Sequence, residues 1–101
     1  MILRKNITTS GQAVTLINKN SNFGRSQTLR KITISNNSDN PATVIVDLFD
    51  GSSTVFYICK NVIIPKGVVL VLEDNLSFKI QNFNLRIYNT GSSPDLTIMI
   101  A

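Results

Sequence analysis

Apolar and polar residues alternate along much of the sequence with a period of two. Between residues 42 and 49 the even positions are all apolar: Ala42, Val44, Val46 and Leu48. Because successive side chains of a β-strand point to opposite faces, this alternation predicts a strand with one buried face. No segment shows a sustained apolar period of about 3.6 residues, so we expect no helix of useful length.

Strands are expected wherever similar apolar runs lie between turn signals. They are predicted at residues 13–18, 28–35, 42–49, 54–60, 68–73, 76–80, 85–88 and 96–100. Asparagine, aspartate, glycine and proline mark the main turns between them, at residues 36–41, 50–53, 65–67, 74–75 and 90–95. Leu29 falls out of phase with Ile32 and Ile34, which predicts a bulge near Arg30 and Lys31.

About eight short strands without a helix predict an all-β fold, an antiparallel β-sandwich. Jelly-roll-like and immunoglobulin-like connections both fit, because the pattern does not tell which strands pair. At 101 residues the chain is long enough for one domain with one core. Residues 1–12 are polar and threonine-rich, so we expect an N-terminal arm followed by a single sandwich domain at 13–101. No apolar run reaches the roughly 18 residues of a membrane span, and no signal peptide is recognisable.

Several predicted strands also carry apolar residues on the face that should be polar. Each such side chain left in water forgoes about 1.5–3 kcal/mol of burial, so a monomer that exposed all of them would be sticky. We expect another subunit to cover them, and the alternative is that loops and the N-terminal arm do so. The candidate interface residues are Ile45, Phe49, Val69, Val71, Met99 and Phe23, the last of which stands alone in a polar loop.

The formal net charge of +4 is unevenly distributed. Six of the ten basic residues precede Asp39, the first acidic residue, and beyond it acids slightly outnumber bases. A basic third of the chain could contact an acidic protein surface or a polyanion, and the alternative is solvated charges on loops. The candidate docking residues are Arg4, Lys5, Lys19, Arg25, Arg30 and Lys31.

Residue types that commonly carry catalysis are scarce. The sequence has no histidine, which removes Ser-His and Cys-His arrangements and the common zinc sites. The single cysteine, Cys59, lies in an apolar run and is expected to be a buried, unreactive thiol. Asp47, Asp50, Glu73 and Asp74 could hold Ca²⁺ only if the fold gathered them. We predict that the protein is not an enzyme and has no cofactor and no metal site. Its basic residues are not interleaved with aromatic ones as in a stacking platform, so the sequence does not indicate binding of nucleic acid.

Three stretches resemble small β-sandwich virion proteins of tailed bacteriophages, marine ones in particular. They are ATVIVDLFDG at 42–51, YICKNVIIPKG at 57–67 and LVLEDN at 70–75. The shared layout is a hairpin with Asp-Gly, a turn with Pro and Gly, and an apolar strand, and it covers roughly residues 31 to 101. The resemblance implies a structural part of the particle surface, without catalysis and without active residues to carry over.

The resemblance, the two-faced strands and the uneven charge together predict a capsid decoration, or cement, protein. It would bind the major capsid protein or another virion protein on the outer head surface, as a homo-oligomer with a trimer favoured, after assembly in the bacterial cytoplasm. A tail, neck or fibre-attachment protein is the alternative within the virion. A module that binds a glycan or polyanion through the basic residues, Tyr57 and Tyr88 is the alternative of another class. Neither a membrane nor a nucleic acid is expected as a partner.

Overall fold

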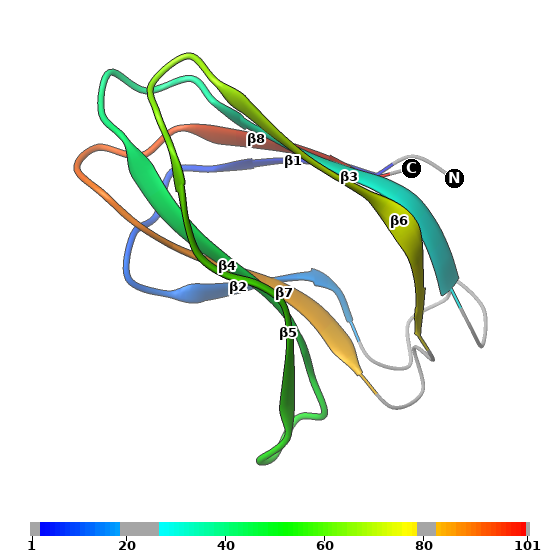
Figure 1. Cartoon of the computed structure of the whole chain (residues 1–101). Coiled ribbons are helices and arrows are strands. Elements are labelled where there is room, and N and C mark those ends of the chain that lie inside the picture. Colours follow the sequence, from blue (N-terminus) through cyan, green and yellow to red (C-terminus); the bar gives the residue numbers. More distant parts are fainter. Residues whose placement is uncertain (1–2, 19–26, 79–82, 101) are drawn as a thin grey trace.

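The computed structural model describes residues 3–18, 27–78 and 83–100, which form eight strands and no helix (Figure 1). The strands are β1 (Leu3–Ile7), β2 (Ala13–Ile17), β3 (Gln27–Asn36), β4 (Ala42–Phe49), β5 (Val55–Ile64), β6 (Val69–Phe78), β7 (Asn84–Thr90) and β8 (Leu96–Ile100). The predicted all-β sandwich is confirmed. In this part of the chain there is therefore no helix long and apolar enough to cross a membrane.

The strands form two four-stranded antiparallel sheets that face each other (Figure 1). Sheet I has the order β1-β8-β3-β6, and sheet II has the order β2-β7-β4-β5. The pairs β1–β8, β2–β7, β3–β6 and β4–β5 are nested within one another along the sequence, as in a long hairpin rolled over on itself. This is the connectivity of a jelly roll, one of the two alternatives that the sequence left open.

The prediction of an N-terminal arm is wrong for residues 3–7. They form β1, which pairs with β8 from Leu3 opposite Ile100 to Ile7 opposite Leu96, and Ile7 is buried in the core. The predicted turn at Asp74 and Asn75 is also wrong, because β6 continues through both residues. The structure therefore has eight strands, as expected, but they are not the same eight. Residues 3–7 add one strand, and the two strands predicted at 68–73 and 76–80 are the single strand β6.

Register shifts in the sheets fall where strands change phase. The predicted bulge near Arg30 and Lys31 is confirmed by a shift in the β3–β6 pairing between Leu29 and Lys31. Two further shifts occur where β5 pairs with β4, and Asn61 in β5 has a φ of 55°. A residue with this left-handed backbone is common at bulges, and it allows β5 to continue to Ile64.

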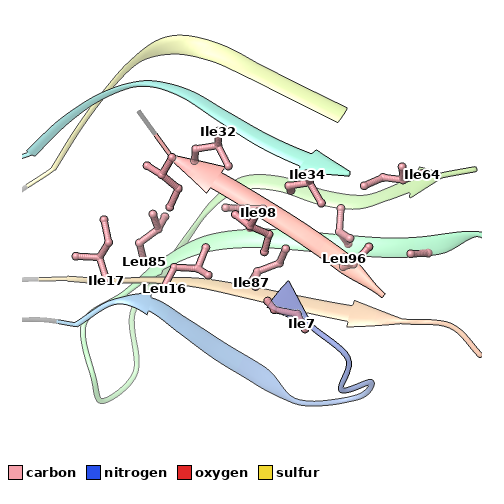
Figure 2. Packing of buried hydrophobic residues seen from close by; sticks show 14 residues of the cluster. Ile7, Leu16, Ile17, Ile32, Ile34, Ile64, Leu85, Ile87, Leu96 and Ile98 are labelled. Atoms are coloured by element: carbon pink, nitrogen blue, oxygen red, sulfur yellow. The ribbon is translucent and has the colours of Figure 1, made fainter. Parts of the chain in front are cut away.

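The core lies between the inner faces of the two sheets and consists of branched aliphatic side chains (Figure 2). It is lined by the positions that the alternation predicts in β3, β4 and β8, and by every second residue of β7 from Leu85. The buried hydrophobic residues are Ile7, Leu16, Ile17, Ile32, Ile34, Ala42, Val44, Val46, Ile64, Leu85, Ile87, Leu96, Ile98 and Ile100.

Asn36 is buried at the end of the sandwich where strands cross between the sheets, and it is 1% exposed. Its Nδ2 donates hydrogen bonds to the carbonyl oxygens of Asn40 (2.8 Å) and Ile64 (2.9 Å). Its Oδ1 accepts hydrogen bonds from the N–H (3.1 Å) and the hydroxyl (2.7 Å) of Ser38. The side chain therefore ties the end of β3 to the β3–β4 connection and to the end of β5.

Backbone hydrogen bonds extend this network to the other connections. The Asn36 N–H donates to the carbonyl of Val68, and the Gly67 N–H donates to the carbonyl of Asn36. The Asn37 N–H donates to the carbonyl of Asp95 in the β7–β8 connection. The segment we predicted only as a turn thus holds three of the four connections at this end of the sandwich.

The β5–β6 connection is a turn of residues 65–68, at the place where the sequence predicted one. The Val68 N–H donates to the Pro65 carbonyl at 3.2 Å, which makes proline the first residue and Gly67 the third. Gly67 has a φ of 71°, the conformation that the third position of a type II turn requires. Glycine is therefore needed at this position because of the backbone conformation, and not because a larger side chain would lack space.

The Asp-Gly signal at residues 50 and 51 forms the β4–β5 hairpin, as predicted. Asp50 Oδ1 accepts hydrogen bonds from the N–H groups of Ser52 (2.8 Å), Ser53 (3.0 Å) and Thr54 (3.1 Å). These donors, Ser52 foremost, hold the pKa of the Asp50 carboxyl well below its ordinary value of 3.8.

The Asp50→Asn variant should lose less stability in acid than the wild-type protein does. Because the folded pKa is lowered, the stabilisation by the carboxylate is complete above 3.8 and is lost as the pH falls toward the folded pKa. Thermal unfolding of both proteins from neutral pH down to below 3.8 measures the difference. Parallel curves for the two proteins over that range would contradict the assignment.

Candidate functional site

The outward side of sheet I carries three exposed apolar side chains in polar surroundings. We call this surface the outer face of sheet I. Its residues alternate with the core residues of the same strands and are Arg4, Asn6, Lys31, Thr33, Ser35, Val69, Val71, Glu73, Thr97 and Met99. The exposed fractions are 48% for Val69, 42% for Val71 and 40% for Met99.

The strand register places these side chains in two rows across the sheet. In the first row, Arg4 lies opposite Met99, Met99 opposite Thr33, and Thr33 opposite Val71. Met99 and Val71 are thus separated by one strand, which corresponds to about 10 Å. The row presents a small apolar area of Met99, the Thr33 methyl and Val71, with a cation at its β1 end.

The second row is polar over most of its length. Asn6 lies opposite Thr97, Thr97 opposite Ser35, and Ser35 opposite Val69. The Thr97 hydroxyl donates to Asn6 Oδ1 at 3.0 Å and accepts from Asn37 Nδ2 at 2.8 Å. Because these polar groups already bond one another, contact with a partner protein would cost them little further desolvation.

Two charged groups of opposite sign lie at one end of the outer face of sheet I. Lys31 Nζ and Glu73 Oε1 are 3.9 Å apart, and their side chains are 49% and 69% exposed. An exposed pair at this distance adds at most about 1 kcal/mol of stability, so both groups can exchange partners easily. The surface therefore combines apolar contacts with charges that a partner could recognise.

The outward side of sheet II has a different construction. Asp47 of β4 lies opposite Arg86 of β7, and the two form a bidentate ion pair with N–O distances of 2.8 Å and 3.1 Å. Their side chains are only 7% and 20% exposed. The Arg86 guanidinium also lies over the Phe49 ring, 4.0 Å from its centroid. This arrangement covers the middle of the sheet with the protein's own side chains.

The predicted interface residues therefore do not form one surface. Ile45 and Phe49 lie on the outward side of sheet II, where both are half-buried. Val69, Val71 and Met99 lie together on the opposite side of the sandwich, in sheet I. Phe23 lies outside the described residues. The outer face of sheet I is the candidate functional site, because the described interface candidates that stay exposed all lie on it.

The predicted basic residues are also divided. Arg4 and Lys31 lie on the outer face of sheet I, whereas Lys5 lies opposite Ile98 and is exposed at the edge of the inner side. The backbone of Arg30 belongs to β3, but its side chain is outside the described part of the structure. Lys19 and Arg25 both fall outside the described residues.

Four further apolar or aromatic residues are exposed, and of these the sequence had indicated only Tyr57, as a candidate ligand contact. Phe56 (55%), Tyr57 (52%) and Ile63 (64%) belong to β5, and Val68 (43%) to the turn before β6. The ring of Phe56 packs edge-on against Phe83, and Lys60 Nζ lies 4.7 Å from the centroid of Tyr57. The bulges in β5 shift its alternation, so the sequence did not indicate which of these side chains face solvent.

Of the four carboxylates considered for Ca²⁺, three lie at separate places, and the side chain of Asp74 is outside the described part of the structure. Asp47 pairs with Arg86, Asp50 binds the N–H groups of its own hairpin, and Glu73 lies beside Lys31. Among the described residues no three groups suitable as metal ligands cluster. Cys59 is half-buried in β5, and burial raises the pKa of its thiol. A thiol with a raised pKa is a poor nucleophile at neutral pH.

Comparisons with known proteins do not assign the chain to a family. No protein-family model matches the sequence, and no curated protein shows significant similarity to it.

Proposed function

We propose that the protein is a non-enzymatic structural subunit of a tailed-bacteriophage particle, a capsid decoration (cement) protein that binds the outer head surface. The outer face of sheet I is its binding surface, and the major capsid protein is its partner. The observation that carries the proposal is the exposure of Val69, Val71 and Met99 on the same face of sheet I. The three stretches that resemble phage virion proteins supply the biological setting.

The chemistry of the face fits a protein partner. Apolar side chains at the centre of an interface, with polar and charged groups around them, are the usual composition of a protein contact. Arg4 on β1 and Lys31 on β3, which lies beside Glu73, add charged groups that an acidic lattice could contact. A homo-oligomer that contacts several capsid subunits at once gains avidity from its linked contacts, so a modest contact area per copy is sufficient.

The first test is the number of copies in purified particles of the phage that encodes the chain. Quantitative mass spectrometry should find hundreds of copies per particle, and a reconstruction should place them on the head. A few copies confined to the tail or neck would favour the alternative of an attachment protein. Absence from the particle would contradict both.

The second test measures binding of purified protein to particles that lack it. Met99→Glu places a charge in the middle of the outer face of sheet I and should weaken binding about tenfold or more, the effect of losing one good interface contact. Ile63→Glu is the matched control, because Ile63 is equally apolar and more exposed, at 64%, but belongs to sheet II. If Ile63→Glu abolished binding and Met99→Glu did not, the proposed surface would be wrong.

A second candidate is a module that binds a glycan or polyanion. It is favoured by Tyr57, which is half exposed and lies next to the Lys60 ammonium. Retention on a heparin column at moderate salt, or a signal on a glycan array, that disappears in Tyr57→Ala would support it. Absence of binding in both assays would favour the capsid decoration protein.

A further inference from the structure

Each sheet of the sandwich has two edge strands, and three of the four are protected against pairing with another chain. Natural proteins protect edges with short strands, charged side chains, proline or bulges. β1 has five residues and carries Arg4 and Lys5, both exposed. β2 has five residues and a register shift, and β5 has two register shifts.

The charges and the register shift of the fourth edge, β6, lie from Glu73 onward, and the strand has none of these protections between Val69 and Leu72. The stretch holds no charge and no proline, and it pairs with β3 in continuous register from Val69 opposite Ser35 to Glu73 opposite Lys31. β3 is the only described neighbour of β6. Over these four residues the edge is therefore regular and apolar, and no other described strand pairs with it.

The free backbone groups of this edge belong to the exposed valines. The Val68 carbonyl accepts a hydrogen bond from Asn36 of β3, so it points toward β3. Because the direction of these groups alternates along an antiparallel strand, the N–H and C=O of Val69 and Val71 point away from β3. The inward side chains Leu70 and Leu72 are only half-buried, since β3 flanks them on one side and no described strand flanks them on the other.

We propose that β6 pairs antiparallel with β6 of a second copy about a two-fold axis at Leu70. The two copies of sheet I then form one continuous sheet, with the four-stranded order β1-β8-β3-β6 repeated in reverse. The inference does not depend on the proposed function, because it concerns the isolated protein. It gives a two-fold pair in place of the trimer expected from the sequence.

The sequence of β6 is complementary to itself in this register. Val69 lies opposite Val71 of the second copy, and Leu70 lies opposite its own counterpart, so apolar residues meet on both faces. This register brings Glu73 toward the turn at residues 65–68 of the second copy, where Lys66 is exposed. Moving the axis to Val71 would place Glu73 opposite Val69 and remove the Glu73–Lys66 contact, so the charges favour Leu70 as the centre.

Oxidative cross-linking of single-cysteine variants tests the register. In a Cys59→Ser background, Leu70→Cys should form a disulfide-linked dimer, since directly opposed residues without mutual hydrogen bonds have Cα atoms about 4.5 Å apart. Val71→Cys is the matched control and should not cross-link, because its counterpart is a diagonal neighbour at roughly 7–8 Å. Cross-linking of Val71→Cys but not Leu70→Cys would overturn the proposed register.

Analytical ultracentrifugation tests the pairing itself. Wild-type protein should be a dimer, and Val71→Pro should weaken its association about a hundredfold, because each copy loses one edge N–H. The ladder to β3 does not use that N–H, so Val71→Pro should keep its circular dichroism and unfolding transition. Val71→Thr, which retains the N–H, should stay within about tenfold of wild type. A wild-type monomer, or a trimer unaffected by Val71→Pro, would overturn the proposal.

Discussion

Replacing Asn36 with alanine should destabilise the protein by about 3–5 kcal/mol. The side chain is 1% exposed and makes hydrogen bonds with both its amide and its carbonyl groups. Its removal leaves buried partners without a hydrogen bond, among them the carbonyl of Ile64, at about 1–3 kcal/mol for each group. Urea denaturation should show a lower midpoint with an unchanged slope.

Asn37→Ala is the control for this variant. Asn37 is the neighbouring asparagine, but it is exposed, and its side-chain bond to the Thr97 hydroxyl lies at the surface. Its loss should cost about 1 kcal/mol or less. Asn36→Asp keeps the shape and the acceptor but removes both amide donors, so it should resemble Asn36→Ala. Equal costs for Asn36→Ala and Asn37→Ala would show that the buried network does not hold the connections together.

Replacing Arg86 with methionine should also cost about 3–5 kcal/mol. The variant leaves the Asp47 carboxylate, which is 7% exposed, without its bidentate partner, and an uncompensated buried charge is strongly destabilising. It also removes the guanidinium from the face of the Phe49 ring. Thermal or urea unfolding of the purified variant gives the value directly.

The double variant Asp47→Leu with Arg86→Met separates the loss of the pair from the cost of the unpaired charge. Replacing both partners by apolar groups is often close to neutral, so the double variant should recover most of the lost stability. Lys31→Met breaks the exposed pair with Glu73 and should change stability by less than about 1 kcal/mol. A double variant as unstable as Arg86→Met alone would contradict this explanation.

The alternation of apolar residues was sufficient to identify which side chains of β4 and β8 form the core. It failed for β1, because an edge strand need not be apolar along its inward side, and Lys5 interrupts the pattern between Leu3 and Ile7. It also failed at Asp74 and Asn75. These residue types favour both turns and the irregular backbone of a bulge, and here the strand continues.

The candidate site could be predicted only in part, because it depends on which strands are neighbours. The sequence showed that Phe49 and Val71 each lie opposite a core face. It did not show that β4 and β6 belong to different sheets, which places these residues on opposite sides of the sandwich. The pairing of Asp47 with Arg86 was hidden for the same reason, since β4 and β7 are far apart in the sequence.

The position of β8 constrains the order in which the protein can fold as it is synthesised. β8 lies between β1 and β3 and pairs with both, yet it is translated after the other seven strands. The β4–β5 hairpin can form early, whereas β1 has no partner until β8 leaves the ribosome. In sheet I the β3–β6 pair can form before then, but sheet I is completed only when β8 pairs with β1 and β3, and contacts this distant in sequence are slow to form. During that interval the nascent chain is most exposed to aggregation and most dependent on chaperones.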